Sequence, residues 1–313
     1  IACTCAAMKY FEYMASLYTQ QSNNIAKTWA LMIGFFVLVM AVGWVAAQYF
    51  GNPAVLWIAV LFSVGMNITA YWFSDKIALS SAGATEADPA QFRELHRMVE
   101  NLAITAGLPK PKVYIINDPA PNAFAAGRDP KHSVVAVTTG LLERLDRTEL
   151  EGVIAHELSH VGNRDILVMT VAVVLAGFLS VLADMFLRVS MFGGGDNRDS
   201  KANPIVLVLG VIGIVLAPIA AQLIQLSISR KREFLADASG ALLTRYPDGL
   251  ASALMKISSY SQPLERASSA TAHLYISNPF GPGAARSFLT KLFSTHPPVE
   301  ERIAALQGMR GRV

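Results

Sequence analysis

Charged residues are scarce in this sequence. Asp, Glu, Lys and Arg together make up 16% of the 313 residues, whereas soluble domains usually carry about 25%. Hydrophobic residues account for 53%, so the composition indicates a membrane protein. The net charge of +3 is too small to suggest a nucleic-acid partner. Cysteine is nearly absent: Cys3 and Cys5 are too close for a relaxed disulfide. This excludes a disulfide framework and fits a domain that faces the cytoplasm.

Long uncharged runs divide the chain. No Asp, Glu, Lys, Arg or His occurs between Lys27 and Asp75, and a Gly-Asn-Pro turn at 51–53 interrupts this run near its middle. Because a spanning helix needs about 20 apolar residues, the run predicts a transmembrane hairpin, and two later apolar runs predict two further spans. Basic residues flank the ends that would then lie in the cytoplasm, together with both termini. The predicted division is an N-terminal cytoplasmic segment at 1–28, a hairpin at 29–73 (about 29–50 and 54–73), a first soluble part at 74–165, a third span at 166–187, a periplasmic loop at 188–203, a fourth span at 204–228 and a second soluble part at 229–313.

The two soluble parts predict a mixed α and β domain. Apolar spacing favours a helix over 88–106 with Asp88 as its cap. Runs rich in β-branched residues predict strands at 112–116 and 133–138. Asp146 followed by Glu149 predicts a capping box that begins a helix over 147–163.

That last helix carries the most specific motif in the chain. His156, Glu157 and His160 form H-E-x-x-H, although the chain has only 6 histidines. Residues i and i+4 share a helical face, so both imidazoles can bind one cation. Glu157 is then placed to reach a water molecule rather than the metal, as in zinc peptidases.

A catalytic zinc site needs a third protein ligand. A third histidine six residues after His160 is excluded, because that position is Ile166. Glu233 and Asp237 lie on one helical face just after the predicted fourth span: Glu233 can bind zinc, and Asp237 can accept a proton from a ligand imidazole. The alternative is an ordinary charge cluster where a helix leaves the membrane.

Four motifs in chain order resemble the bacterial HtpX family of membrane proteases and, more distantly, the CAAX prenyl endopeptidases of the same gluzincin group. They are PNAFAAG (121–127), VIAHELSHVGNRD (153–165), SRKREFLAD (229–237) and STHPP (294–298). The resemblance implies a mainly α membrane protein, with four transmembrane helices and an α+β zincin-like catalytic domain built from two sequence segments. It also implies one Zn²⁺ per chain held by His156, His160 and Glu233, with Glu157 as the general base.

The resemblance also implies roles for residues that carry no independent signal. Asn122, Ala123, Phe124 and Ala125 match the edge segment to which a substrate strand adds, and otherwise read as a plain turn. His296 matches a hydrogen-bond donor to the oxyanion, and Arg302 a residue that assists it. Both could equally be surface residues of the last helix.

These expectations favour a zinc endopeptidase of the bacterial cytoplasmic (inner) membrane. Its expected substrates are misfolded or damaged membrane proteins and unfolded polypeptides, including its own chain by self-cleavage, as part of a stress response. Two alternatives are site-specific processing of the prenyl-endopeptidase type and a non-catalytic membrane scaffold with a structural metal. Structural zinc sites usually close with a fourth Cys or His, which argues against the scaffold.

Overall fold

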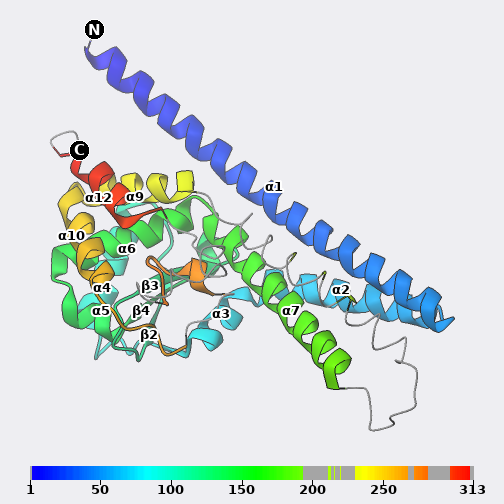
Figure 1. Ribbon diagram of the computed structural model, residues 1–313. Coiled ribbons are helices and arrows are strands. Elements are labelled where there is room, and N and C mark those ends of the chain that lie inside the picture. Colours follow the sequence, from blue (N-terminus) through cyan, green and yellow to red (C-terminus); the bar gives the residue numbers. More distant parts are fainter. Residues whose placement is uncertain are drawn as a thin grey trace.

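Long apolar helices extend from a compact α/β domain. The computed structural model describes residues 2–192, 211, 212, 215, 219, 230–266, 271–280 and 297–310. Within these, three helices are long and apolar enough to cross a membrane, at Gln21–Tyr49, Ala54–Trp72 and Asp165–Asp184. Figure 1 shows α2 and α7 extending from one end of the α/β domain, whereas α1 runs past the domain and lies along α2 and α7 only with its C-terminal half. The predicted fourth span, 204–228, lies almost wholly outside the described residues.

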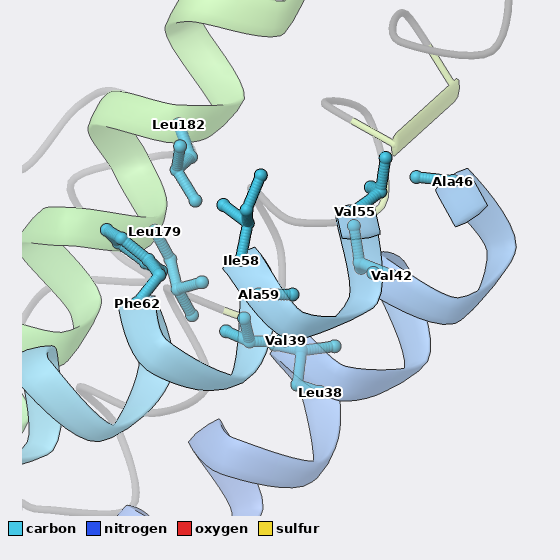
Figure 2. A pocket seen from close by; sticks show the side chains of 11 residues that line it. Leu38, Val39, Val42, Ala46, Val55, Ile58, Ala59, Phe62, Leu179 and Leu182 are labelled. Carbon is cyan, nitrogen blue, oxygen red and sulfur yellow. The ribbon is translucent and has the colours of Figure 1, made fainter. Parts of the chain in front are cut away.

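The first two candidate spans form a helical hairpin. Helix α1 (Ala2–Phe50) is continuous from the start of the chain, and α2 (Ala54–Trp72) follows a three-residue turn. Gly51 has φ +63°, which glycine adopts without strain. Gly43 lets the helices approach closely, because a Cβ there would lie 2.4 Å from that of Ala59. Near the turn, aliphatic side chains of α1, α2 and α7 (Asp165–Phe192) line an apolar cavity of about 240 Å³ (Figure 2).

A four-stranded sheet of order β1-β2-β4-β3 forms the centre of the α/β domain. Strand β2 runs parallel to β4, whereas β1 and β3 are antiparallel to their neighbours. Both predicted strands are confirmed, as β2 and β4. The strands are β1 (Ala84–Glu86), β2 (Lys112–Ile116), β3 (Ala123–Gly127) and β4 (Ser133–Thr138).

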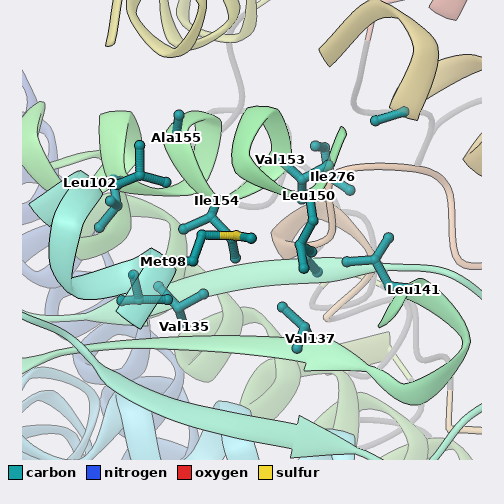
Figure 3. Packing of buried hydrophobic residues seen from close by; sticks show 14 of the residues in the cluster. Met98, Leu102, Val135, Val137, Leu141, Leu150, Val153, Ile154, Ala155 and Ile276 are labelled. Atoms are coloured by element: carbon teal, nitrogen blue, oxygen red, sulfur yellow. The ribbon is translucent and has the colours of Figure 1, made fainter. Parts of the chain in front are cut away.

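Helices cover both faces of the sheet, so β4 is buried on both sides. Val135 and Val137 pack against the helix of the H-E-x-x-H motif, α6 (Arg147–Gly162), and against α4 (Arg93–Thr105), as Figure 3 shows. Val134 and Ala136 face α3 (Ser74–Ala82) and the start of α7. The sheet therefore joins α6, which carries the H-E-x-x-H motif, to the candidate membrane span in α7.

Helix α6 begins as predicted. The Asp146 side chain accepts a hydrogen bond from the backbone N–H of Glu149, and Glu149 accepts one from that of Asp146, which completes a capping box. Helix α4 begins five residues later than predicted, at Arg93. Asp88 instead accepts from the N–H of Ala90, two residues on, so it closes a local turn, as aspartate commonly does.

The elements that follow residue 229 pack directly on α6. Ser252 and Lys256 bind the carboxylate of Glu149. Gly240 lies against the backbone of α6, where a Cβ would be 2.9 Å from the nitrogen of His156. The elements are α5 (Thr139–Arg144) in the first part, α9 (Arg230–Thr244), α10 (Pro247–Ser258) and α12 (Val299–Gln307) in the second, and the short 3-10 turns η1 (Pro130–His132) and η2 (Ala272–Leu274).

Candidate metal centre

Two histidines of α6 face each other inside the domain. His156 and His160 are both buried, and their Nε2 atoms lie 3.2 Å apart. Their rings are nearly perpendicular, and both Nε2 atoms lie close enough together to bind one ion. The i, i+4 spacing on a regular helix produces this arrangement.

Helix α9 supplies a third ligand atom to the same space. Glu233 places one carboxylate oxygen 3.9 Å from Nε2 of His156 and the other 3.6 Å from Nε2 of His160. Zinc bonds of ~2.0–2.1 Å at tetrahedral angles put neighbouring ligand atoms about 3.3 Å apart. Ligand atoms of all three residues lie within 4.8 Å of one another, so the cluster fits a zinc ion.

A carboxylate holds the second nitrogen of each imidazole. Asp237 Oδ1 lies 2.9 Å from Nδ1 of His156, and Asp165 Oδ2 lies 3.0 Å from Nδ1 of His160. Each carboxylate favours the tautomer that carries its proton on Nδ1, which leaves Nε2 free for the metal. The sequence singled out Asp237 but not Asp165. The signal that could have identified Asp165 was its position five residues after His160, where the chain turns into α7.

Each of these carboxylates is in turn held by a buried arginine. Arg302 binds Asp237 through Nε at 2.8 Å and Nη2 at 2.6 Å. Arg232 Nε lies 2.9 Å from Asp165, which also accepts from the Nδ2 of Asn24 at 2.7 Å. The resemblance gave Arg302 the role of assisting the oxyanion donor, and that role stays a prediction; in the structure Nη1 of Arg302 also lies 3.8 Å from Oε2 of Glu233. Asn24 is buried within the candidate span Gln21–Tyr49, so this network links α1 to the metal centre.

Glu157 is buried beside the ligands and receives a hydrogen bond from the backbone N–H of Ala125. Burial, reinforced by the charge of Glu233, raises the pKa of Glu157 to about 7. A carboxyl group with a pKa near neutrality can both take and return a proton, as a general base requires.

The surroundings shift the pKa values of the two histidines in opposite directions. Burial lowers the pKa of His156, which keeps it neutral. Burial also acts to lower the pKa of His160, but the bond to Asp165 and the charge of Glu233 outweigh it and raise the value to about 9. Burial disfavours the charge of Asp237, yet Arg302 holds its pKa at about 2. A cation that binds His160 therefore displaces a proton.

The segment predicted to receive substrate, Asn122–Ala125, includes the start of β3 at the edge of the sheet. Its outer edge is occupied by the chain itself. The N–H of Ile276 donates to the carbonyl of Ala123 at 2.9 Å, Phe124 pairs with Tyr275, and Asn122 bonds to both backbone groups of Ser277. We call Tyr275–Ser277 the covering segment. No sequence pattern indicated it. His296 lies outside the described residues.

Comparison with known proteins is consistent across sequence and structure. Residues 89–310 match the family model for peptidase family M48. The chain is 50% identical over 300 residues to a protein named "Protease HtpX homolog" from Caldanaerobacter subterraneus, covering 94% of this chain and 98% of that protein. A protein of the same name from Tropheryma whipplei is 47% identical over 293 residues, with the same coverage. The crystal structure of S. mikatae Ste24p aligns with 93% of this chain and 67% of its own, at a TM-score of 0.50 and 20% identity.

Proposed function

The chain belongs to peptidase family M48 as an HtpX-like zinc metalloprotease, and we propose that it degrades misfolded or damaged membrane proteins where they meet the bacterial cytoplasmic membrane. The position of the metal centre carries this proposal. Asp165 binds the zinc ligand His160 and is also the first residue of a candidate span. The reacting bond is therefore held next to the bilayer, where segments that leave the membrane are within reach.

The side chains divide the hydrolytic work. When His156, His160 and Glu233 hold a zinc ion, the ion supplies Lewis acidity that polarises a peptide carbonyl and lowers the pKa of a water molecule to about 7. Glu157 takes the proton of the attacking water and passes it to the leaving amine. Asp237 and Asp165 fix the ligand tautomers, while Arg302 and Arg232 neutralise these two carboxylates and hold them in place.

We place the α/β domain in the cytoplasm, and one experiment tests this orientation and distinguishes degradation at many sites from site-specific processing. Inverted inner-membrane vesicles expose the cytoplasmic face, and right-side-out vesicles expose the other. An unfolded soluble protein added outside should be cleaved at many sites by inverted vesicles only. A membrane-permeant chelator should abolish cleavage, and added zinc should restore it.

Each other outcome has a definite meaning. Cleavage by right-side-out vesicles alone would reverse the orientation. Cleavage confined to one site in one substrate would favour a site-specific processing protease. Cleavage that survives chelation would contradict the assignment of the activity to the metal centre.

Substrate strand addition at β3 requires the covering segment to leave. An extended peptide gains main-chain hydrogen bonds at a sheet edge, and here Ile276 occupies the carbonyl of Ala123. The carbonyl of Ile276 also accepts a hydrogen bond from Nη1 of Arg302 at 3.0 Å. We propose that substrate replaces Tyr275–Ser277 along β3 and so competes with the chain's own backbone.

The variant Ile276→Pro removes the N–H that binds Ala123 and keeps the carbonyl that binds Arg302. A hydrogen bond contributes roughly 0.5–1.5 kcal/mol net, so kcat/KM on an unfolded protein should rise about 2–10-fold, mainly through KM. Ile276→Val keeps the N–H and controls for the change in packing. A fall in kcat/KM with zinc content unchanged would mean that the covering segment is part of the substrate-binding site.

A further inference from the structure

A cavity of about 600 Å³ lies where α2 leaves the membrane region, away from the metal centre. Trp72 and Phe73 line it at the end of α2, and Lys112 and Tyr114 of β2 line it from the sheet. Because α2 is a candidate span that ends at Trp72, the cavity lies at the level of the lipid headgroups.

Basic side chains dominate the polar lining. Lys76, Lys112, Arg128 and Lys131 line the cavity together with His132, against the single carboxylate of Asp75. In the part of the chain that the structure describes, no carboxylate lies within ion-pair distance of the three lysines. The cavity therefore carries uncompensated positive charge.

Arg128 joins the charged lining to the membrane. Its guanidinium carbon lies 4.5 Å from the ring centroid of Trp72, and its Nη1 lies 3.5 Å from the Trp72 carbonyl oxygen. Asp129 lies 3.7 Å from Arg128 and accepts a hydrogen bond from the backbone N–H of His132, so the charge of Arg128 is partly neutralised. The three lysines are left to attract a ligand.

An apolar groove continues from the same place into the membrane region. This second cavity, of about 510 Å³, lies between α1 and α2, and Ile68 and Trp72 line both cavities. Trp29, Ile33 and Val64 are among the side chains that line the groove. A ligand with an anionic head and an aliphatic tail fits the pair. The apolar cavity of Figure 2 has no such charged mouth.

We propose that these two cavities together bind one anionic phospholipid, with its phosphate at Lys76, Lys112 and Lys131 and an acyl chain in the groove between α1 and α2. Basic pockets beside membrane helices commonly bind anionic headgroups. The lipid would hold the end of α2 against β2, and so fix the α/β domain relative to the bilayer. The proposal concerns binding and does not depend on proteolysis.

Native mass spectrometry of the full chain, released from detergent with added lipid, tests this directly. The probes are palmitoyl-oleoyl phosphatidylglycerol, the matching phosphatidylcholine and inorganic phosphate. Each basic residue near an anionic lipid is worth about fivefold in affinity, so one phosphatidylglycerol should bind roughly 10–100-fold more tightly than phosphatidylcholine. The double variant Lys112→Gln/Lys131→Gln should lose most of this preference.

A matched double variant, Arg97→Gln/Lys110→Gln, removes the same charge from exposed positions that do not line the cavity and should keep the preference. Equal binding of the two lipids would overturn the proposal, as would phosphatidylglycerol binding unchanged by Lys112→Gln/Lys131→Gln. Displacement of phosphatidylglycerol by an equal concentration of inorganic phosphate would assign the cavity to a soluble anion and equally overturn it. Unchanged zinc content in both variants serves as the check on folding.

Discussion

Replacing Glu157 with glutamine is expected to lower kcat/KM about 10²–10⁴-fold, the usual range for a general acid–base group. Zinc content should not change, because the ligand atoms come from His156, His160 and Glu233. Glutamine keeps the shape of the side chain but cannot take the proton of the attacking water. The measurement is kcat/KM on an unfolded protein, with zinc content determined on the same preparation. Self-cleavage during purification should fall in parallel.

Unfolding cannot account for such a loss. The pKa of Glu157 in the folded, metal-free chain is about 7, above its ordinary value of 4.5. Ionisation of this buried carboxyl therefore destabilises the fold as the pH rises through that window. Glutamine carries no charge, so the variant should be at least as stable as the parent chain at pH 8 in thermal melts without zinc.

A second substitution on the same helix provides the control. Glu151 lies on α6 and pairs with exposed Arg147, so Glu151→Gln should leave both zinc content and kcat/KM unchanged. Activity of Glu157→Gln close to that of Glu151→Gln would mean that another group takes the proton, and would sink the proposed mechanism.

Local sequence signals were enough to predict the helix that carries the motif. A capping box and an i, i+4 histidine pair depend on residues within a few turns of one another, and α6 forms over Arg147–Gly162 as expected. Strands β2 and β4 are likewise confirmed, because runs rich in β-branched residues favour strands, and β4 is buried along its whole length. The resemblance to HtpX, which rested on four short motifs, is confirmed by relatives that cover 94% of the chain.

Contacts between distant segments were beyond sequence reasoning. Asn24 and Asp165 are separated by 141 positions, and neither spacing nor composition links an asparagine in an apolar helix to a zinc ligand. Arg232 had no predicted role beyond its place in the SRKREFLAD motif, yet it is buried against Asp165. The contact between the covering segment and β3 could not be predicted for the same reason, since Asn122 and Ser277 are 155 positions apart.

The predicted first residue of α4 was wrong for a different reason. Aspartate can cap a helix or close a turn with its own neighbours, and both structures satisfy the carboxylate. Asp88 takes the turn, and the apolar side chains of the helix, including Leu95 and Val99, still reach the core. Periodicity therefore identified the buried face correctly but not the first residue.

Replacing Glu233 with alanine is expected to cost more zinc affinity than any change to the groups behind the ligands. Alanine leaves His156 and His160 as a two-point chelate, whereas catalytic zinc sites use three protein ligands. Replacing a group that hydrogen-bonds to a metal ligand lowers metal affinity about 10–100-fold. We therefore expect Asp165→Asn and Asp237→Asn to lower zinc affinity by a factor in that range. Glu233→Ala should exceed it, and the chain should lose its zinc during dialysis against a weak chelator.

Excess zinc separates a ligand from the groups that position ligands. Asp165→Asn and Asp237→Asn should recover most of their zinc content when zinc is added, because all three ligand atoms remain. Glu233→Ala should recover little, and its activity should stay low at any zinc concentration. Glu143→Ala, an exposed carboxylate at the end of α5, should behave like the parent chain. Zinc retained by Glu233→Ala as firmly as by Glu143→Ala would remove Glu233 from the metal centre. The 3.6 Å and 3.9 Å approaches of its oxygens to the imidazoles would then be a buried ion pair and not a binding site.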